Sequence, residues 1–122
     1  MAGAGTVIIT GANLARVGGL LGEGARLVGR KIGLTSAPMQ QLLGVDEPDY
    51  GFILDTMVHP DGGSIPLSSL CAPRVEPEIA FRLNRPLRGP DVSVADVLDA
   101  TDAVAAALEI VDSRIAEWRI TL

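Results

Sequence analysis

The segment 73-PRVEPEIAF-81 decides the fold, because it alternates like a strand and carries two acidic residues inside it. Glu76 and Glu78 are two residues apart, and residues at this spacing in a strand lie on the same face. Pro77, between them, has no N–H to offer to a neighbouring strand. The pattern therefore predicts a strand over about 74–83, at a sheet edge or with a bulge, that presents both carboxylates on one side.

A third acidic residue, Glu109, stands in the apolar segment 107-ALEIV-111. Residues 107–115 alternate as in a strand, and a solvated charge is unexpected in such a segment. Several carboxylates buried together without a counter-charge cost many kcal/mol or take up protons. A divalent cation held by Glu76, Glu78 and Glu109 removes this cost.

The ligand types indicate which cation and which chemistry such a site supports. Three carboxylates, with no histidine or cysteine among the proposed ligands, favour Mg²⁺ or Mn²⁺ over Zn²⁺. A hard cation polarises the chelating oxygens of a 2-oxo acid and stabilises the enolate that forms when the neighbouring carbon loses a proton. The alternative is an ordinary solvated strand face, which is the commoner meaning of an isolated E-x-E pattern.

Composition and charge restrict the class of the protein and its partners. The chain has 122 residues, of which 48% are hydrophobic and 3% aromatic, so we expect a small globular protein with an aliphatic core. The net charge of -5 argues against a nucleic acid or an anionic membrane as partner. The single cysteine, Cys71, forms no internal disulfide, and no signal peptide or membrane-spanning run is recognised. We therefore expect a cytoplasmic protein.

Strand and helix patterns alternate along the chain, which predicts an α/β fold with a mixed sheet. We expect strands over 26–35 and 52–58, separated by a helix over 37–44 and a loop over 45–51.

A second helix begins at the capping pattern of Ser93 and Asp96. Its apolar residues keep roughly helical spacing as far as Val104.

The first 24 residues carry few structural signals. The segment 6-TVIITGAN-13 is similar to the strand and glycine turn of a dinucleotide-binding unit. However, Ala15 and Val17 occupy positions where that motif needs glycine, and the acidic residue that contacts the ribose is missing. We expect an irregular, loosely packed lead-in over residues 1–24.

A resemblance to a known family is carried by four ordered strings, 29-GRKIGLTS-36, 49-DYGFILD-55, 73-PRVEPEIAF-81 and 108-LEIVDSRI-115. Together they resemble the 2-keto-4-pentenoate hydratase and 4-oxalocrotonate decarboxylase group of the fumarylacetoacetate hydrolase superfamily. The resemblance covers residues 25–122. It implies the N-terminal part of a hydratase-like catalytic domain, folded as a partial β-roll.

The resemblance also implies a site and a reaction. Its carboxylate trio, which binds Mg²⁺ or Mn²⁺, corresponds to Glu76, Glu78 and Glu109. Its motif lysine, the proton-transfer residue, corresponds to Lys31. Asp55 is implied as a polar neighbour of the substrate, although it equally suits the end of a strand. The implied reaction adds water to 2-hydroxypenta-2,4-dienoate and gives 4-hydroxy-2-oxopentanoate in the breakdown of aromatic compounds.

Two alternatives to the hydratase stay open. The sister decarboxylase uses the same cation and enolate but releases carbon dioxide, and a non-catalytic remnant or binding subunit keeps the cation site without turnover. Members of the group are longer than this chain, so the resemblance implies a fragment or truncated product whose strands lie bare. The expected partners are a small anionic 2-oxo or 2-hydroxy dienoate, and further copies of the chain or a pathway enzyme.

Overall fold

The computed structural model describes residues 6–10, 14–113 and 115–119. The chain divides into two compact units. We call Met1–Ile9 together with His59–Leu122 the glutamate unit, and Thr10–Val58 the lysine unit. Strands and helices follow one another along the chain, which confirms the predicted α/β class.

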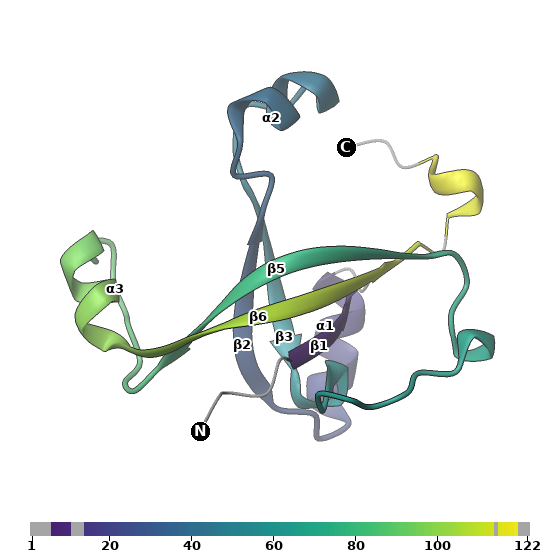
Figure 1. Ribbon diagram of the computed structural model, residues 1–122, viewed down its shortest axis with the longest axis horizontal. Coiled ribbons are helices and arrows are strands. Elements are labelled where there is room, and N and C mark those ends of the chain that lie inside the picture. Colours follow the sequence, from purple (N-terminus) through teal and green to yellow (C-terminus); the bar gives the residue numbers. More distant parts are fainter. Residues whose placement is uncertain (1–5, 11–13, 114, 120–122) are drawn as a thin grey trace. The chain divides into compact units, whose positions relative to one another are not determined.

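A sheet of four strands, in the order β4-β1-β6-β5, organises the glutamate unit. Its strands are β1 (Thr6–Thr10), β4 (Val58–His59), β5 (Pro73–Leu83) and β6 (Thr101–Asp112). The long strands β5 and β6 run antiparallel side by side (Figure 1). As predicted, the proline-containing strand β5 lies at the edge of the sheet. Among the described residues, one side of this strand has no ladder partner, so Pro77 is accommodated.

Helix α3 (Val94–Ala100) connects β5 to β6 and begins as the sequence predicts. The Ser93 hydroxyl accepts a hydrogen bond from the Asp96 N–H at 3.2 Å, and the Asp96 carboxylate accepts one from the Ser93 N–H at 2.8 Å. The expected extension to Val104 is wrong, because Val104 pairs with Phe81 across the β5–β6 ladder. The energy of strand pairing outweighs the local helical spacing at this position.

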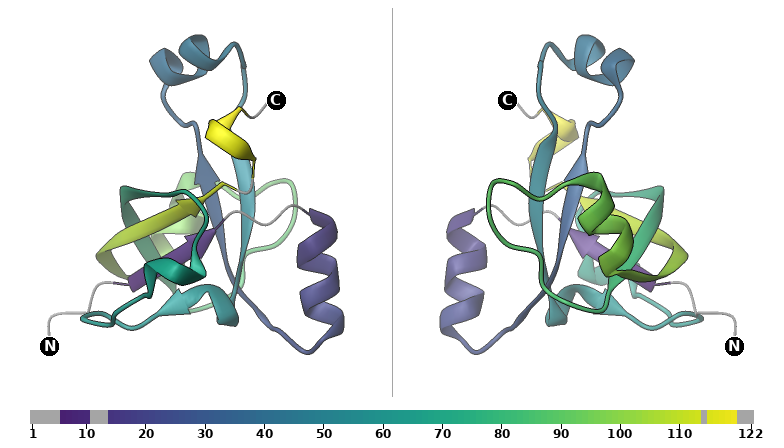
Figure 2. Two further views of the ribbon diagram at one scale, coloured as in Figure 1. Left: turned by 90° about the vertical axis from the view of Figure 1, so that its right-hand side faces the viewer. Right: turned by 90° about the vertical axis from the view of Figure 1, so that its left-hand side faces the viewer.

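The lysine unit contains α1 (Leu14–Gly22), β2 (Leu27–Gly33), α2 (Ala37–Leu43) and β3 (Asp49–Leu54). Strands β2 and β3 form an antiparallel ribbon, and α2 lies at the end where the chain passes from one strand to the other (Figure 2). Helix α2 ends at Gly44, whose φ of 71° is left-handed and therefore favours glycine, as the sequence predicts.

Two expectations for the first half of the chain are wrong. Much of the lead-in expected to be irregular is regular, because β1 and α1 lie within it. The sequence of α1, LARVGGLLG, contains enough leucine and alanine to form a helix in spite of its glycines. The expected loop over 45–51 is also too long, because β3 already begins at Asp49, which pairs with Gly33 of β2.

Two strand boundaries differ from the sequence-based expectation as well. The strand expected over 52–58 ends at Leu54, and Asp55–Met57 form a single 3-10 turn. The strand expected over 107–115 already begins at Thr101 and ends at Asp112. In each case pairing with a distant strand sets the boundary, and local residue patterns do not report it.

Few large side chains are buried among the described residues. The buried hydrophobic residues are Val17, Leu54, Met57, Ala100 and Ala107. On β5, by contrast, Val75, Ile79 and Phe81 are 57–67% exposed. These three residues alternate with the glutamates, so they belong to the opposite face of the strand. The exposure of this apolar face agrees with the expectation that strands lie bare. No described helix is long and apolar enough to span a membrane.

Candidate metal centre

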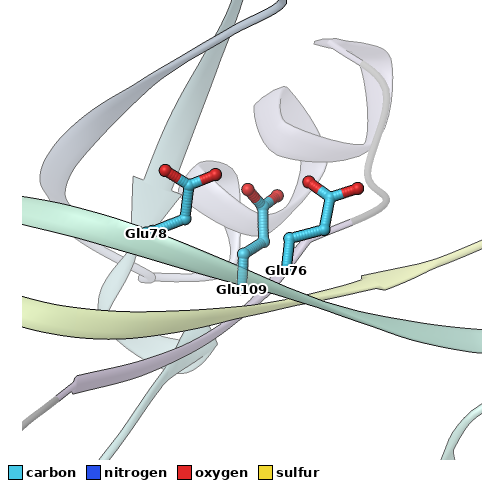
Figure 3. Close-up of side chains that lie close together, drawn as sticks. All are labelled: Glu76, Glu78 and Glu109. Atoms are coloured by element: carbon cyan, nitrogen blue, oxygen red, sulfur yellow. The ribbon is translucent and has the colours of Figure 1, made fainter.

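Glu76, Glu78 and Glu109 converge on one face of the β5–β6 pair. Glu109 lies directly opposite Glu76 in the ladder, and Glu78 follows two residues later on β5. All three carboxylates point to the same side of the strands (Figure 3). One oxygen from each lies within 4.8 Å of the others. The two-residue period of a strand, which the sequence pattern predicts, and the direct pairing of β5 with β6 together produce this cluster.

The cluster is buried at one end and open at the other. Glu109, on the inner strand β6, is only 5% exposed. Glu76 and Glu78, on the edge strand, are exposed. Ala107 lies opposite Glu78, so the adjoining position of β6 carries only a methyl group. A group held by the three carboxylates would therefore keep a side that solvent and small molecules reach.

The three carboxylates fit a hard divalent cation. Mg²⁺ binds oxygens at about 2.0–2.1 Å and Ca²⁺ at about 2.3–2.6 Å, so oxygens on opposite sides of the ion are about 4–5 Å apart. The observed limit of 4.8 Å lies in this range for Ca²⁺ and exceeds it by less than 1 Å for Mg²⁺. Small rotations of glutamate side chains remove such a difference. Oxygen-only ligands also suit these ions better than Zn²⁺.

Asp112 anchors the segment that leads into β5. Its buried carboxylate accepts hydrogen bonds from the backbone N–H of Cys71 at 2.9 Å and of Ala72 at 2.8 Å. Asp112 is also the ladder partner of Pro73, the first residue of β5. These contacts hold the start of β5 against the end of β6, and the same register places Glu76 opposite Glu109. The sequence does not single out this role, because Cys71 is 41 residues away.

The other two predicted site residues, Lys31 and Asp55, belong to the lysine unit. Lys31 is half-buried in β2 and faces Gly51 of β3. Asp55 follows β3, and its carboxylate accepts hydrogen bonds from the backbone N–H and from Nε of Arg26, each at 2.9 Å. The backbone bond, then the side-chain bond, lower the pKa of Asp55. Asp55 therefore fixes the end of β3 to Arg26, and its contact with a substrate stays a prediction.

Comparison with known proteins shows close relatives along most of the chain. It is 48% identical over 103 residues to the 2-hydroxypent-2,4-dienoate hydratase of Pseudomonas putida, which covers 84% of this chain and 46% of the relative. It is 56% identical over 97 residues to the 2-keto-4-pentenoate hydratase of Paraburkholderia xenovorans (strain LB400), which covers 80% of this chain and 36% of the relative. Over these residues the chain is homologous to members of the 2-keto-4-pentenoate hydratase and 4-oxalocrotonate decarboxylase group.

Solved structures of this group share the fold. The 4-oxalocrotonate decarboxylase from Pseudomonas putida G7, complexed with magnesium and adipate, superposes with a TM-score of 0.75 at 34% identity, over 85% of this chain and 40% of that one. Its complex with calcium and acetate gives a TM-score of 0.67 at 38% identity, over 77% and 36%. No family model matches the chain. The chain spans less than half of the length of these hydratases and decarboxylases.

Proposed function

We propose that this chain carries the metal centre of a hydratase that converts 2-hydroxypenta-2,4-dienoate to 4-hydroxy-2-oxopentanoate. The observation that carries the proposal is the convergence of the Glu76, Glu78 and Glu109 oxygens within 4.8 Å. The names of the hydratase relatives support the reaction, and the magnesium in the decarboxylase complex supports the cation. The cation is Mg²⁺ or Mn²⁺.

Each predicted residue has a proposed task. Glu76, Glu78 and Glu109 hold the cation, and the exposed side of the cluster leaves room for the 2-oxo acid and water. When bound, the cation supplies a positive charge that stabilises the enolate oxygen at C2. Lys31 moves a proton during ketonisation of the dienol to the conjugated ketone, and water then adds its hydroxyl at C4 and its hydrogen at C3. Asp55, held ionised by Arg26, offers a polar contact to the substrate.

A decarboxylase is the second candidate, because both superposed structures are decarboxylases. A binding subunit that holds the cation without turnover is the third, because the carboxylate cluster alone is enough to bind a cation. Exposed apolar residues on the other face of β5 support association with further copies or with a pathway enzyme. The single cysteine supports a cytoplasmic location.

The three candidates are separated by assaying the purified chain with Mg²⁺ and with Mn²⁺ on both substrates. Loss of dienoate absorbance identifies the hydratase, and release of carbon dioxide from 4-oxalocrotonate identifies the decarboxylase. A folded chain that binds the cation but converts neither substrate is a binding subunit. Glu109→Gln, which removes a proposed ligand, is the test variant. Its matched control is Glu117→Gln, which changes an exposed glutamate outside the cluster.

A further inference from the structure

Lys31 lies opposite Gly51 in the β2–β3 ladder, and this pairing is unusually close. A Cβ atom added at Gly51 would lie 2.5 Å from Cγ and 2.8 Å from Cδ of Lys31. Real Cβ atoms essentially never approach another heavy atom closer than 3.0 Å. The aliphatic part of the half-buried lysine therefore occupies the space that a side chain at position 51 would need.

Space, and not backbone conformation, is the reason for glycine at this position. Four described glycines, Gly24, Gly44, Gly62 and Gly89, have a positive φ, and Gly51 is not among them. Gly33, on the same ribbon, provides a comparison. Its φ is also ordinary, and a Cβ there would only reach an ordinary contact of 4.0 Å with Cβ of Asp49.

We propose that Gly51 is a positioning residue for Lys31. Because residue 51 has no side chain, the space beside it, here called the slot, holds the Cγ and Cδ atoms of Lys31 and so directs the amino group. The proposal rests on the proton-transfer role of Lys31 in the proposed function. Cγ and Cδ lie near the base of the lysine side chain. Lys31 therefore cannot avoid a methyl group at position 51 by moving only Cε and Nζ. The lysine has to adopt another rotamer, which moves Nζ to a different place.

The sequence offers a clean probe, because Lys31 is the only lysine among the 122 residues. Reductive methylation with ¹³C-formaldehyde labels Lys31 and the terminal amine and nothing else on a side chain. We expect the ¹³C signal of methylated Lys31 to shift in Gly51→Ala. It should stay at its native position in the matched control Gly33→Ala, which adds the same methyl group to the same ribbon.

A thermal double-mutant cycle tests the same contact through stability. Gly51→Ala should lower the melting temperature by roughly 5 °C or more, since overpacking is destabilising. In the Lys31→Ala background, where the stem is absent, Gly51→Ala should have little effect on the melting temperature. If the single variant does not fold at all, the double variant should recover folding.

The proposal is overturned if folded Gly51→Ala leaves the Lys31 signal in place, or if its melting penalty persists in the Lys31→Ala background. Neither measurement depends on turnover. The proposed function has a separate test in Lys31→Met. Full hydratase activity of this variant would contradict the proton-transfer role of Lys31, but it would not affect the inference that Gly51 positions the lysine.

Discussion

Glu76 and Glu109 are direct partners in the β5–β6 ladder, with Glu78 two residues further along the same face. Like charges placed directly opposite each other destabilise a sheet. We therefore expect the pairing of Glu76 with Glu109 to cost stability when no cation is bound. On the proposed function, stability and cation binding should be linked.

The first prediction concerns the linked effects of Glu76→Gln. We expect the metal-free variant to unfold at a temperature equal to or above that of the native chain, because one of three repelling charges is gone. We also expect it to lose the response to Mg²⁺. For the native chain we expect that response to be about 2.7 kcal/mol when free Mg²⁺ is 100 times the dissociation constant. Thermal unfolding with and without MgCl₂ measures both effects.

Glu117→Gln serves as the matched control, because it removes the same charge from an exposed position outside the cluster. It should respond to Mg²⁺ like the native chain. Calorimetric titration of Glu109→Gln adds an independent check, since an unchanged affinity for the cation would refute the metal centre.

The second prediction concerns Asp112→Ala. This change removes the acceptor of the Cys71 and Ala72 N–H groups and should cost about 3 kcal/mol of unfolding free energy, as expected for hydrogen bonds to a charged group. Urea unfolding measures the loss, and Asp91→Ala, at an exposed loop position, is the control. Equal stability of the two variants would mean that Asp112 does not anchor β5.

The parts of the site that could be predicted from the sequence are those encoded locally. The spacing of Glu76 and Glu78 fixes their common face, and Pro77 indicates an edge strand. The capping pattern at Ser93 and the left-handed Gly44 likewise depend only on residues within one turn. Local geometry is sufficient for each of these predictions.

The parts that could not be predicted depend on which distant residues meet. The register that brings Lys31 onto Gly51, the bond from Asp112 back to Cys71, and the start of β3 at Asp49 all arise from strand pairing. The residue pattern of a strand does not indicate which strand it pairs with. Where local secondary-structure propensity and strand pairing disagree, pairing determines the structure.

The third prediction concerns the cap of α3 and its dependence on pH. Hydrogen bonds from the Ser93 hydroxyl, then from its backbone N–H, lower the pKa of Asp96. A lowered pKa means that the ionised Asp96 contributes stability above its unfolded value of about 3.8, which is lost as the pH falls through the lower folded value.

Ser93→Ala should therefore cost about 1 kcal/mol of unfolding free energy at pH 7, and less at pH 3. It keeps a residual cost at low pH, because the Asp96 N–H loses its acceptor at any pH. Urea unfolding at the two pH values measures the difference, with the exposed Ser68→Ala as control. A cost that grows on acidification would contradict the assignment.

The last prediction separates two ways in which Arg26 holds Asp55. The largest cause of the lowered pKa of Asp55 is the backbone N–H of Arg26, and the Arg26 side chain comes second. Arg26→Gln keeps the backbone bond, whereas Asp55→Asn loses the charge that both bonds stabilise. We therefore expect melting temperatures to decrease in the order native, Arg26→Gln, Asp55→Asn. The ¹³C carboxyl titration of Asp55 in Arg26→Gln should still show a pKa below 3.8. A return to the ordinary value would show that the guanidinium, and not the backbone N–H of Arg26, holds the carboxylate.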